Sequence, residues 1–177
     1  MSESRRAMTS WLGSLARGGV LGRAHALAGE AIASFVVGED ALGELRAWLR
    51  DQSDEIATRE RRAAIEVCIW MAHADREVHS EERAMLRDLV AQSGLDEDTQ
   101  DALVTAVHEP PSLDGIETRL THPVLRELLL ALAWELAQAD ERIHDAEREA
   151  YGELARRLGV SHERANQIRE SVSETIA

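Results

Sequence analysis

The chain has 177 residues, of which 44% are hydrophobic, and a formal net charge of −13 at pH 7. This length suits one domain with a substantial hydrophobic core and an extension, and the negative charge makes sequence-independent binding to nucleic acid unfavourable. All basic residues are arginine and Cys68 is the single cysteine, so lysine chemistry, an intrachain disulfide and a thiolate metal cluster are excluded.

The sequence predicts a cytoplasmic protein. No stretch approaches the roughly 20 apolar residues that a membrane-spanning helix requires. Arg17 and Arg23 interrupt the apolar letters near the N-terminus, which argues against a secretory signal. A single cysteine is also typical of a reducing compartment.

Apolar residues recur at intervals of three and four, so the sequence predicts helices and no strand. Residues 8–37 are rich in alanine and include five glycines, which disfavour one continuous helix. An amphipathic helix follows at about 40–51, with Leu42, Leu45, Trp48 and Leu49 on one face. We expect residues 1–55 to form a helical extension that packs on the rest of the protein.

The arginines of this extension permit another interpretation. Arg5, Arg6, Arg17 and Arg23 alternate with apolar residues such as Trp11, an arrangement suited to peripheral contact with an anionic membrane. Packing onto the bundle is the simpler expectation, because the helix at 40–51 also needs a surface to cover.

Residues 56–177 are predicted to form the main domain. Helices are expected at about 56–75, 80–92 and 96–107, and the Pro-Pro segment at 108–112 should interrupt the chain. After a short helical stretch at 113–119, further helices are expected at about 122–139, 145–157 and 161–175. Residues 65–72 and 128–136 are apolar on nearly all sides, as expected for two buried central helices. The fold class is therefore an all-α helical bundle.

One pattern of residues occurs twice. The first copy contains Asp75, His79 and Glu82, and the second contains the same residue types 65 positions later, at Asp140, His144 and Glu147. The match continues to Gly94 in the first copy and Gly159 in the second. Such a match at constant offset indicates an internal duplication, with repeats at about 56–107 and 122–175.

The repeated pattern suggests a metal site. Each aspartate lies near the predicted end of a central helix, and the histidine and glutamate begin the next helix. Oxygen and imidazole ligands suit a divalent cation, so all six residues are candidate ligands for Ca, Mg, Mn or Zn. An aspartate at a helix C-terminus is also unfavourable for the helix dipole, which calls for a compensating partner.

Helix capping is the alternative explanation of the same pattern. His79 or Ser80, and His144 or Asp145, stand where the next helix needs an N-cap. Glu82 and Glu147 then lie inside the first turn, where a carboxylate accepts hydrogen bonds from free amides. From the sequence alone, both explanations remain open.

The pattern also resembles the TerB-like tellurite-resistance family. The resemblance rests on the order Ala-Asp, Val or Ile, and Glu-Arg at each junction, followed by Leu-Gly-Val-Ser at 158–161. It covers about residues 60–175 and implies a duplicated helical bundle that acts in stress response, with Asp75, Glu82, Asp140 and Glu147 forming an acidic site that binds metal. Arg76 and Glu141 stand where that family has glycine.

A third hypothesis concerns the C-terminal part. Residues 154–169 have the pattern of a DNA-binding helix-turn-helix, with Arg164, Asn166, Gln167 and Arg169 on the second helix. The matching segment of the first repeat precedes an acidic helix, so a corner of the fold is the simpler explanation. No phosphate loop, nucleophile elbow or His-Glu-x-x-His motif is present, so we expect no enzyme activity. We predict a non-enzymatic module that binds a protein partner, or a purely structural adaptor without metal.

Overall fold

The computed structural model describes residues 36–74, 78, 80–138 and 143–176, and over these residues the chain is entirely helical, with eight helices and no strand. This confirms the prediction of an all-α fold. In chain order the helices are α3 (Glu39–Asp51), α4 (Asp54–Ala72), α5 (Ser80–Ala91), α6 (Glu97–Ala106), α7 (Ile116–Arg119), α8 (Pro123–Ala137), α9 (Asp145–Arg157) and α10 (His162–Ile176).

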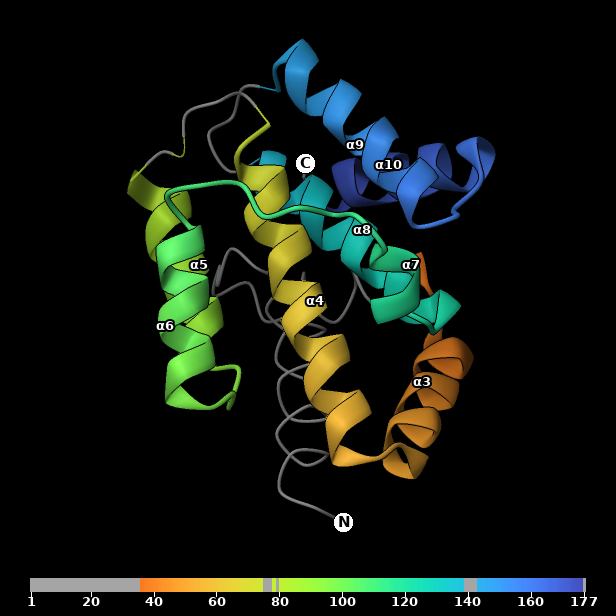
Figure 1. The fold of residues 1–177 in the computed structure, drawn as a ribbon. Helices are drawn as coiled ribbons and strands as arrows, with labels where there is room; N and C mark the ends of the chain where they lie inside the picture. The colour runs from red at the N-terminus through yellow and green to blue at the C-terminus, as the bar shows by residue number, and fades with distance from the viewer. Residues whose placement is uncertain (1–35, 75–77, 79, 139–142, 177) are drawn as a thin grey trace.

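Helices α4 and α8 form the centre of the bundle. They lie side by side and make the most extensive contact between any two helices described (Figure 1). The stretches at 65–72 and 128–136, predicted as buried, are almost fully buried, with only Trp70 partly exposed. Helices α5 and α6 flank α4, whereas α9 and α10 flank α8 (Figure 1). The apolar surface of the two central helices is thus covered from both sides.

Side chains before the helices help to fix where α4, α8 and α10 begin. The Ser53 hydroxyl accepts a hydrogen bond of 3.3 Å from the Ile56 N–H at the start of α4. His122 Nδ1 accepts one of 3.2 Å from the Val124 N–H, and Pro123 occupies the first position of α8. The Ser161 hydroxyl accepts a hydrogen bond from the Arg164 N–H at the start of α10. Each bond satisfies an amide that has no partner within its helix.

Glycines in the left-handed conformation follow α5 and α9. Gly94 has a φ of 66° and Gly159 a φ of 69°. After α9 the chain makes a hydrogen bond of 2.9 Å from the Val160 N–H back to the Ala155 carbonyl. This is the bond that closes a helix when a left-handed residue follows it, and glycine adopts that conformation with the least strain.

The central helices end earlier than the sequence predicted. The expected ends were residues 75 and 139, but α4 ends at Ala72 and α8 at Ala137. The last turn tightens, because the His73 N–H bonds to the Trp70 carbonyl at 3.2 Å and the Gln138 N–H to the Glu135 carbonyl at 3.2 Å. Both helices therefore stop three residues before the motif aspartates in the sequence. In the sequence the aspartates thus follow the last turn, within which the helix dipole acts.

Buried carboxylates connect α4 to the segment before α8. Glu60 accepts hydrogen bonds from the Thr121 N–H at 3.1 Å and from the Thr121 hydroxyl at 2.7 Å. Glu66 pairs with Arg119 of α7 and, at 3.1 Å, with Arg62 one turn earlier in α4. These polar contacts add to the hydrophobic core in joining α4 to α7 and to the segment before α8.

Helix α3 packs against α8 and supplies Leu42, Leu45 and Leu49 to the core. Trp48 is partly buried, and its ring lies 5.0 Å from the ring of His122. Residues 1–35, which carry the predicted membrane contact, lie outside the described residues. No helix of the described part has both the length and the apolar character needed to cross a membrane.

Candidate functional site

Three of the six predicted ligands can be placed. Glu82 lies in the first turn of α5, and His144 and Glu147 lie at the start of α9. Asp75, His79 and Asp140 lie outside the described residues. Of the predicted ligands, the structure therefore describes only those at the starts of α5 and α9.

Glu147 acts as a cap at the start of α9. Its Oε2 accepts a hydrogen bond of 2.7 Å from the backbone N–H of His144, the residue immediately before the helix. The side chain of Glu147 is only 4% exposed, whereas that of His144 is exposed to solvent. A carboxylate at the third helical position that reaches back to the N-cap amide is half of a capping box. The capping explanation thus describes the contact that Glu147 makes.

Glu82 occupies the same position in α5. It is the third residue of its helix, as Glu147 is of α9, and it is 6% exposed. A buried carboxylate requires hydrogen-bond or charge partners to be stable, and Glu82 has such an interaction. The burial of both glutamates indicates that each contributes to its junction as an interior residue.

Apolar residues before α5 and α9 also match. Val78 and Ile143 are partly buried and pack against the core. Arg83, next to Glu82, donates a hydrogen bond of 3.0 Å to the Val78 carbonyl and so holds the approach to α5. The packing of these two apolar residues helps to fix the chain where it enters each helix.

The described side chains that could donate ligand atoms to a metal ion can be examined at both junctions. Among the described residues, no three histidine, cysteine, aspartate or glutamate side chains group closely enough to hold a cation. Glu147 already binds an amide through one oxygen, although a carboxylate retains further lone pairs for a cation. A complete ligand set at either junction would need Asp75 or Asp140, with Glu82 or Glu147 and the neighbouring histidine.

Residues after the central helices have roles that the spacing did not reveal. His73 follows α4, and its Nε2 lies 3.1 Å from the Val107 carbonyl just beyond α6. Gln138 follows α8, and its Nε2 donates a hydrogen bond of 3.0 Å to the Ser173 hydroxyl in α10. His73 therefore contacts the residue that follows α6, and Gln138 contacts α10.

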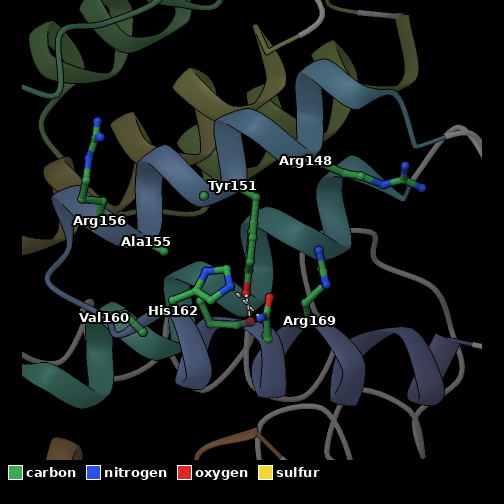
Figure 2. A pocket seen from close by; sticks show the side chains of 10 residues that line it. Arg148, Tyr151, Ala155, Arg156, Val160, His162 and Arg169 are labelled. Atoms are coloured by element: carbon green, nitrogen blue, oxygen red, sulfur yellow. Dashed lines mark hydrogen bonds between the residues drawn. The ribbon is translucent and has the colours of Figure 1, made fainter.

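A pocket of about 350 Å³ lies between α9 and α10 (Figure 2). Figure 2 shows Tyr151 extending from α9 toward α10, Arg169 rising from α10 beside it, and Arg148 and Arg156 near opposite ends of α9. Its walls combine small or apolar residues with polar and cationic ones: Arg148, Tyr151, Gly152, Ala155, Arg156, Val160, His162, Ala165, Asn166 and Arg169.

Buried aromatic residues pack beside this pocket, where Tyr151 lines it and contacts Trp134 behind it. The rings of Trp134 and Tyr151 meet edge to face at 5.0 Å, and the Arg169 guanidinium lies 5.7 Å from the Trp134 ring centre. The Trp134 indole N–H donates to the Ser173 hydroxyl at 3.1 Å, and the Tyr151 hydroxyl donates to the Ala165 carbonyl at 2.7 Å. Burial raises the pKa of Tyr151 above its ordinary value, although Arg169 and Arg164 oppose this shift. Tyr151 is therefore a neutral wall of the pocket.

The sequence was compared with protein-family models, with curated proteins and with solved structures. One family model, described as a protein of unknown function, DUF533, matches residues 2–172. The chain belongs to the DUF533 family. No curated protein and no solved structure matched.

In this DUF533 chain, the predicted DNA-reading residues of α10 are engaged in other ways. Arg164 pairs with Glu127 of α8 through contacts of 3.1 and 2.9 Å and donates to the Val36 carbonyl. The hydrogen bond that Arg164 donates to Glu127 raises the pKa of Arg164. Asn166 bonds to His162 at 3.1 Å, and Arg169 stacks on Trp134. In these positions Arg164 holds α10 on α8, and Arg169 lines the pocket.

Proposed function

We propose that this DUF533 chain is a non-enzymatic, TerB-like interaction module built from two copies of a three-helix unit. The proposal is supported by the positions of the helix ends. The ends of α4 and α8, and the starts of α5 and α9 and of α6 and α10, are each 65 residues apart. This is also the offset of the repeated motif. The copies would be α4–α6 and α8–α10, with α3 and α7 outside them.

The observation that carries the proposal is the contact between Glu147 and the His144 amide. It gives one motif carboxylate a structural role at a helix start, and the equivalent burial of Glu82 favours the same role in the first copy. On this proposal the repeated motif fixes the two junctions at which α5 and α9 begin, and the functional surfaces lie on the helices that these junctions position.

The partner we propose is a protein with a basic surface. The chain has a net charge of −13, and the N-cap and exposed face of α6 present four carboxylates: Asp96, Glu97, Asp98 and Asp101. Charge complementarity of this kind mainly raises the association rate and depends on salt. A role in stress response would follow from the TerB-like resemblance.

The experiment for this partner is salt-resolved affinity capture from extracts of the source cell. The matched variant is Glu97→Gln, Asp98→Asn and Asp101→Asn, which removes three charges from an exposed surface. We expect the wild type to retain a basic protein at low salt and to release it at high salt, and the variant to retain far less. Equal capture by the two proteins would contradict the proposed acidic face.

A divalent-cation site at the junctions is the second candidate function. It is favoured by two buried glutamates at equivalent positions, each preceded in the sequence by a motif histidine and aspartate. A cation that binds only the folded state would raise stability with its concentration. The test is elemental analysis of untagged protein beside the Asp75→Ala, Asp140→Ala variant, with thermal melts in Ca, Mg, Mn and Zn. Near-stoichiometric metal that disappears in the variant would establish this candidate. The candidate is eliminated if the protein contains no metal and shows no ion-specific shift in its melting temperature.

A further inference from the structure

We infer that the pocket between α9 and α10 binds a small organic anion with an apolar body, such as an aromatic carboxylate or an organic phosphate. This inference does not depend on the proposed interaction module. Three arginines line the pocket in a chain whose net charge is strongly negative: Arg148, Arg156 and Arg169. A local reversal of charge inside a concavity favours a negatively charged ligand.

Arg169 is the residue that would anchor the anion. Its guanidinium stacks on Trp134, and no carboxylate of the described residues lies within ion-pair distance of it. Trp134 is itself held by its hydrogen bond to Ser173 and by the ring of Tyr151. The Trp134 ring orients the guanidinium, and no described residue occupies its edge N–H groups, which can donate to a carboxylate or phosphate. The site is thus preorganised for an anion.

Arg148 and Arg156 lie near the two ends of α9, and their guanidinium groups point away from Tyr151 (Figure 2), so they raise the positive potential around the pocket from its margin. Arg148 pairs with Asp145, whose side chain is 92% exposed, and Arg156 pairs with Glu153. Exposed ion pairs of this kind contribute little free energy and exchange readily for another anion. Both arginines therefore remain able to attract a ligand, whereas Arg164, committed to Glu127 and Val36, does not.

The rest of the wall fits an apolar body. The Tyr151 ring, Ala155, Val160 and Ala165 provide hydrophobic surface, and the Tyr151 hydroxyl is occupied by the Ala165 carbonyl. A volume of about 350 Å³ lies at the small end of the range for ligand pockets. Inorganic phosphate would use the cationic groups alone, so an aryl group should add affinity.

Gly152 lines the pocket and has no side chain, so a larger residue at this position could fill the pocket. A Cβ added at Gly152 would meet no atom within 4 Å, so a larger side chain can enter the open space without disturbing the fold. Gly43 in α3 has equally open surroundings and does not line the pocket. Gly152→Leu and Gly43→Leu therefore form a matched pair, in which only the first should occlude the ligand.

The test uses the full chain and four probes, with binding followed by Trp fluorescence and by isothermal calorimetry. The probes are benzoate, phenyl phosphate, inorganic phosphate and, as the cationic control, benzylamine. The variants are Arg169→Gln, Gly152→Leu and Gly43→Leu, with Arg87→Gln as an exposed arginine of α5 outside the pocket. Circular dichroism of each variant establishes that the fold is retained.

We expect benzoate and phenyl phosphate to bind the wild type, Gly43→Leu and Arg87→Gln with similar affinity. Binding should weaken about tenfold or more in Arg169→Gln and Gly152→Leu, the size expected for the loss of a charge-assisted contact or of space. Phenyl phosphate should bind more tightly than inorganic phosphate, and benzylamine should not bind. The inference is overturned if no anion binds at millimolar concentration, if benzylamine binds equally well, if inorganic phosphate matches phenyl phosphate, or if Gly152→Leu binds like the wild type.

Discussion

Glu60 and Thr121, 61 positions apart in the sequence, form a partly buried polar contact that joins α4 to the residues before α8. The Glu60 carboxylate is fully buried and accepts hydrogen bonds from both the N–H and the hydroxyl of Thr121. It lies at the connection between the two proposed repeats, where the Pro-Pro segment and α7 bring the chain back to the centre. The contact therefore fixes how one half of the bundle meets the other.

Glu60→Ala should lower the free energy of unfolding by about 2–3 kcal/mol, because it removes two charge-assisted hydrogen bonds and leaves the Thr121 donors without that acceptor. Glu60→Gln should cost less, since an amide oxygen can still accept from Thr121. Urea denaturation provides the measurement, with the exposed Glu149→Ala as the control. Equal stability of Glu60→Ala and Glu149→Ala would show that this contact does not stabilise the fold.

His122 should make stability depend on pH. Its neutral imidazole caps α8 through Nδ1, and burial lowers its pKa, while Glu44 partly opposes this shift. Because the folded pKa lies below the unfolded value of about 6.5, the contribution is complete above that pH and is lost as pH falls through the folded pKa. Protonation also removes the acceptor for the Val124 amide.

The measurement for His122 is urea denaturation of the wild type and His122→Asn between about pH 7.5 and pH 5. Asparagine is a good N-cap without a titratable ring, so its variant should retain helix α8 and lose less stability on acidification. The difference between the two proteins removes the contributions of the other histidines. A difference that does not change with pH would contradict this role of His122.

Cys68 should be unreactive in the folded protein. It is buried in α4, and burial, reinforced by the nearby charge of Glu135, raises its pKa to about 12. The thiolate that reacts with disulfide reagents is therefore scarce at neutral pH, and access is blocked as well. Labelling by an aromatic disulfide should be slow without denaturant and should become rapid and stoichiometric in concentrated urea. Complete labelling of the native protein within seconds would contradict the buried position of Cys68.

Much of the fold could be predicted from the sequence, because local signals determine it. The spacing of apolar residues predicted the helices, and the Pro-Pro segment and Gly94 and Gly159 marked where they stop. The ends of α4 and α8 were placed two to three residues too late. Apolar letters continue to the end of each central helix, but the tightened last turns that end them depend on residues from other helices, including the contact of His73 with Val107.

The candidate sites were less predictable. The sequence left capping and metal binding open for Glu147, and only its contact with the His144 amide gives it a defined role. Arg164 and Arg169 were grouped as residues that read DNA, because both lie on one predicted helix. Their partners, Glu127 and Trp134, lie in α8, far away in the sequence, so no spacing rule could separate an arginine that packs from one that lines a pocket.

The most direct test of the account is the unfolding free energy of the Glu82→Gln, Glu147→Gln double variant beside the Glu82→Ala, Glu147→Ala double variant, with and without divalent cations. A capping role predicts that the glutamine variant stays within about 1 kcal/mol of the wild type, because an amide oxygen still accepts the N-cap N–H. The alanine variant should lose about 2 kcal/mol or more, and no cation should change the order. A glutamine variant as unstable as the alanine variant, together with a cation-dependent stabilisation found only in the wild type, would contradict the account and assign the motif to metal binding.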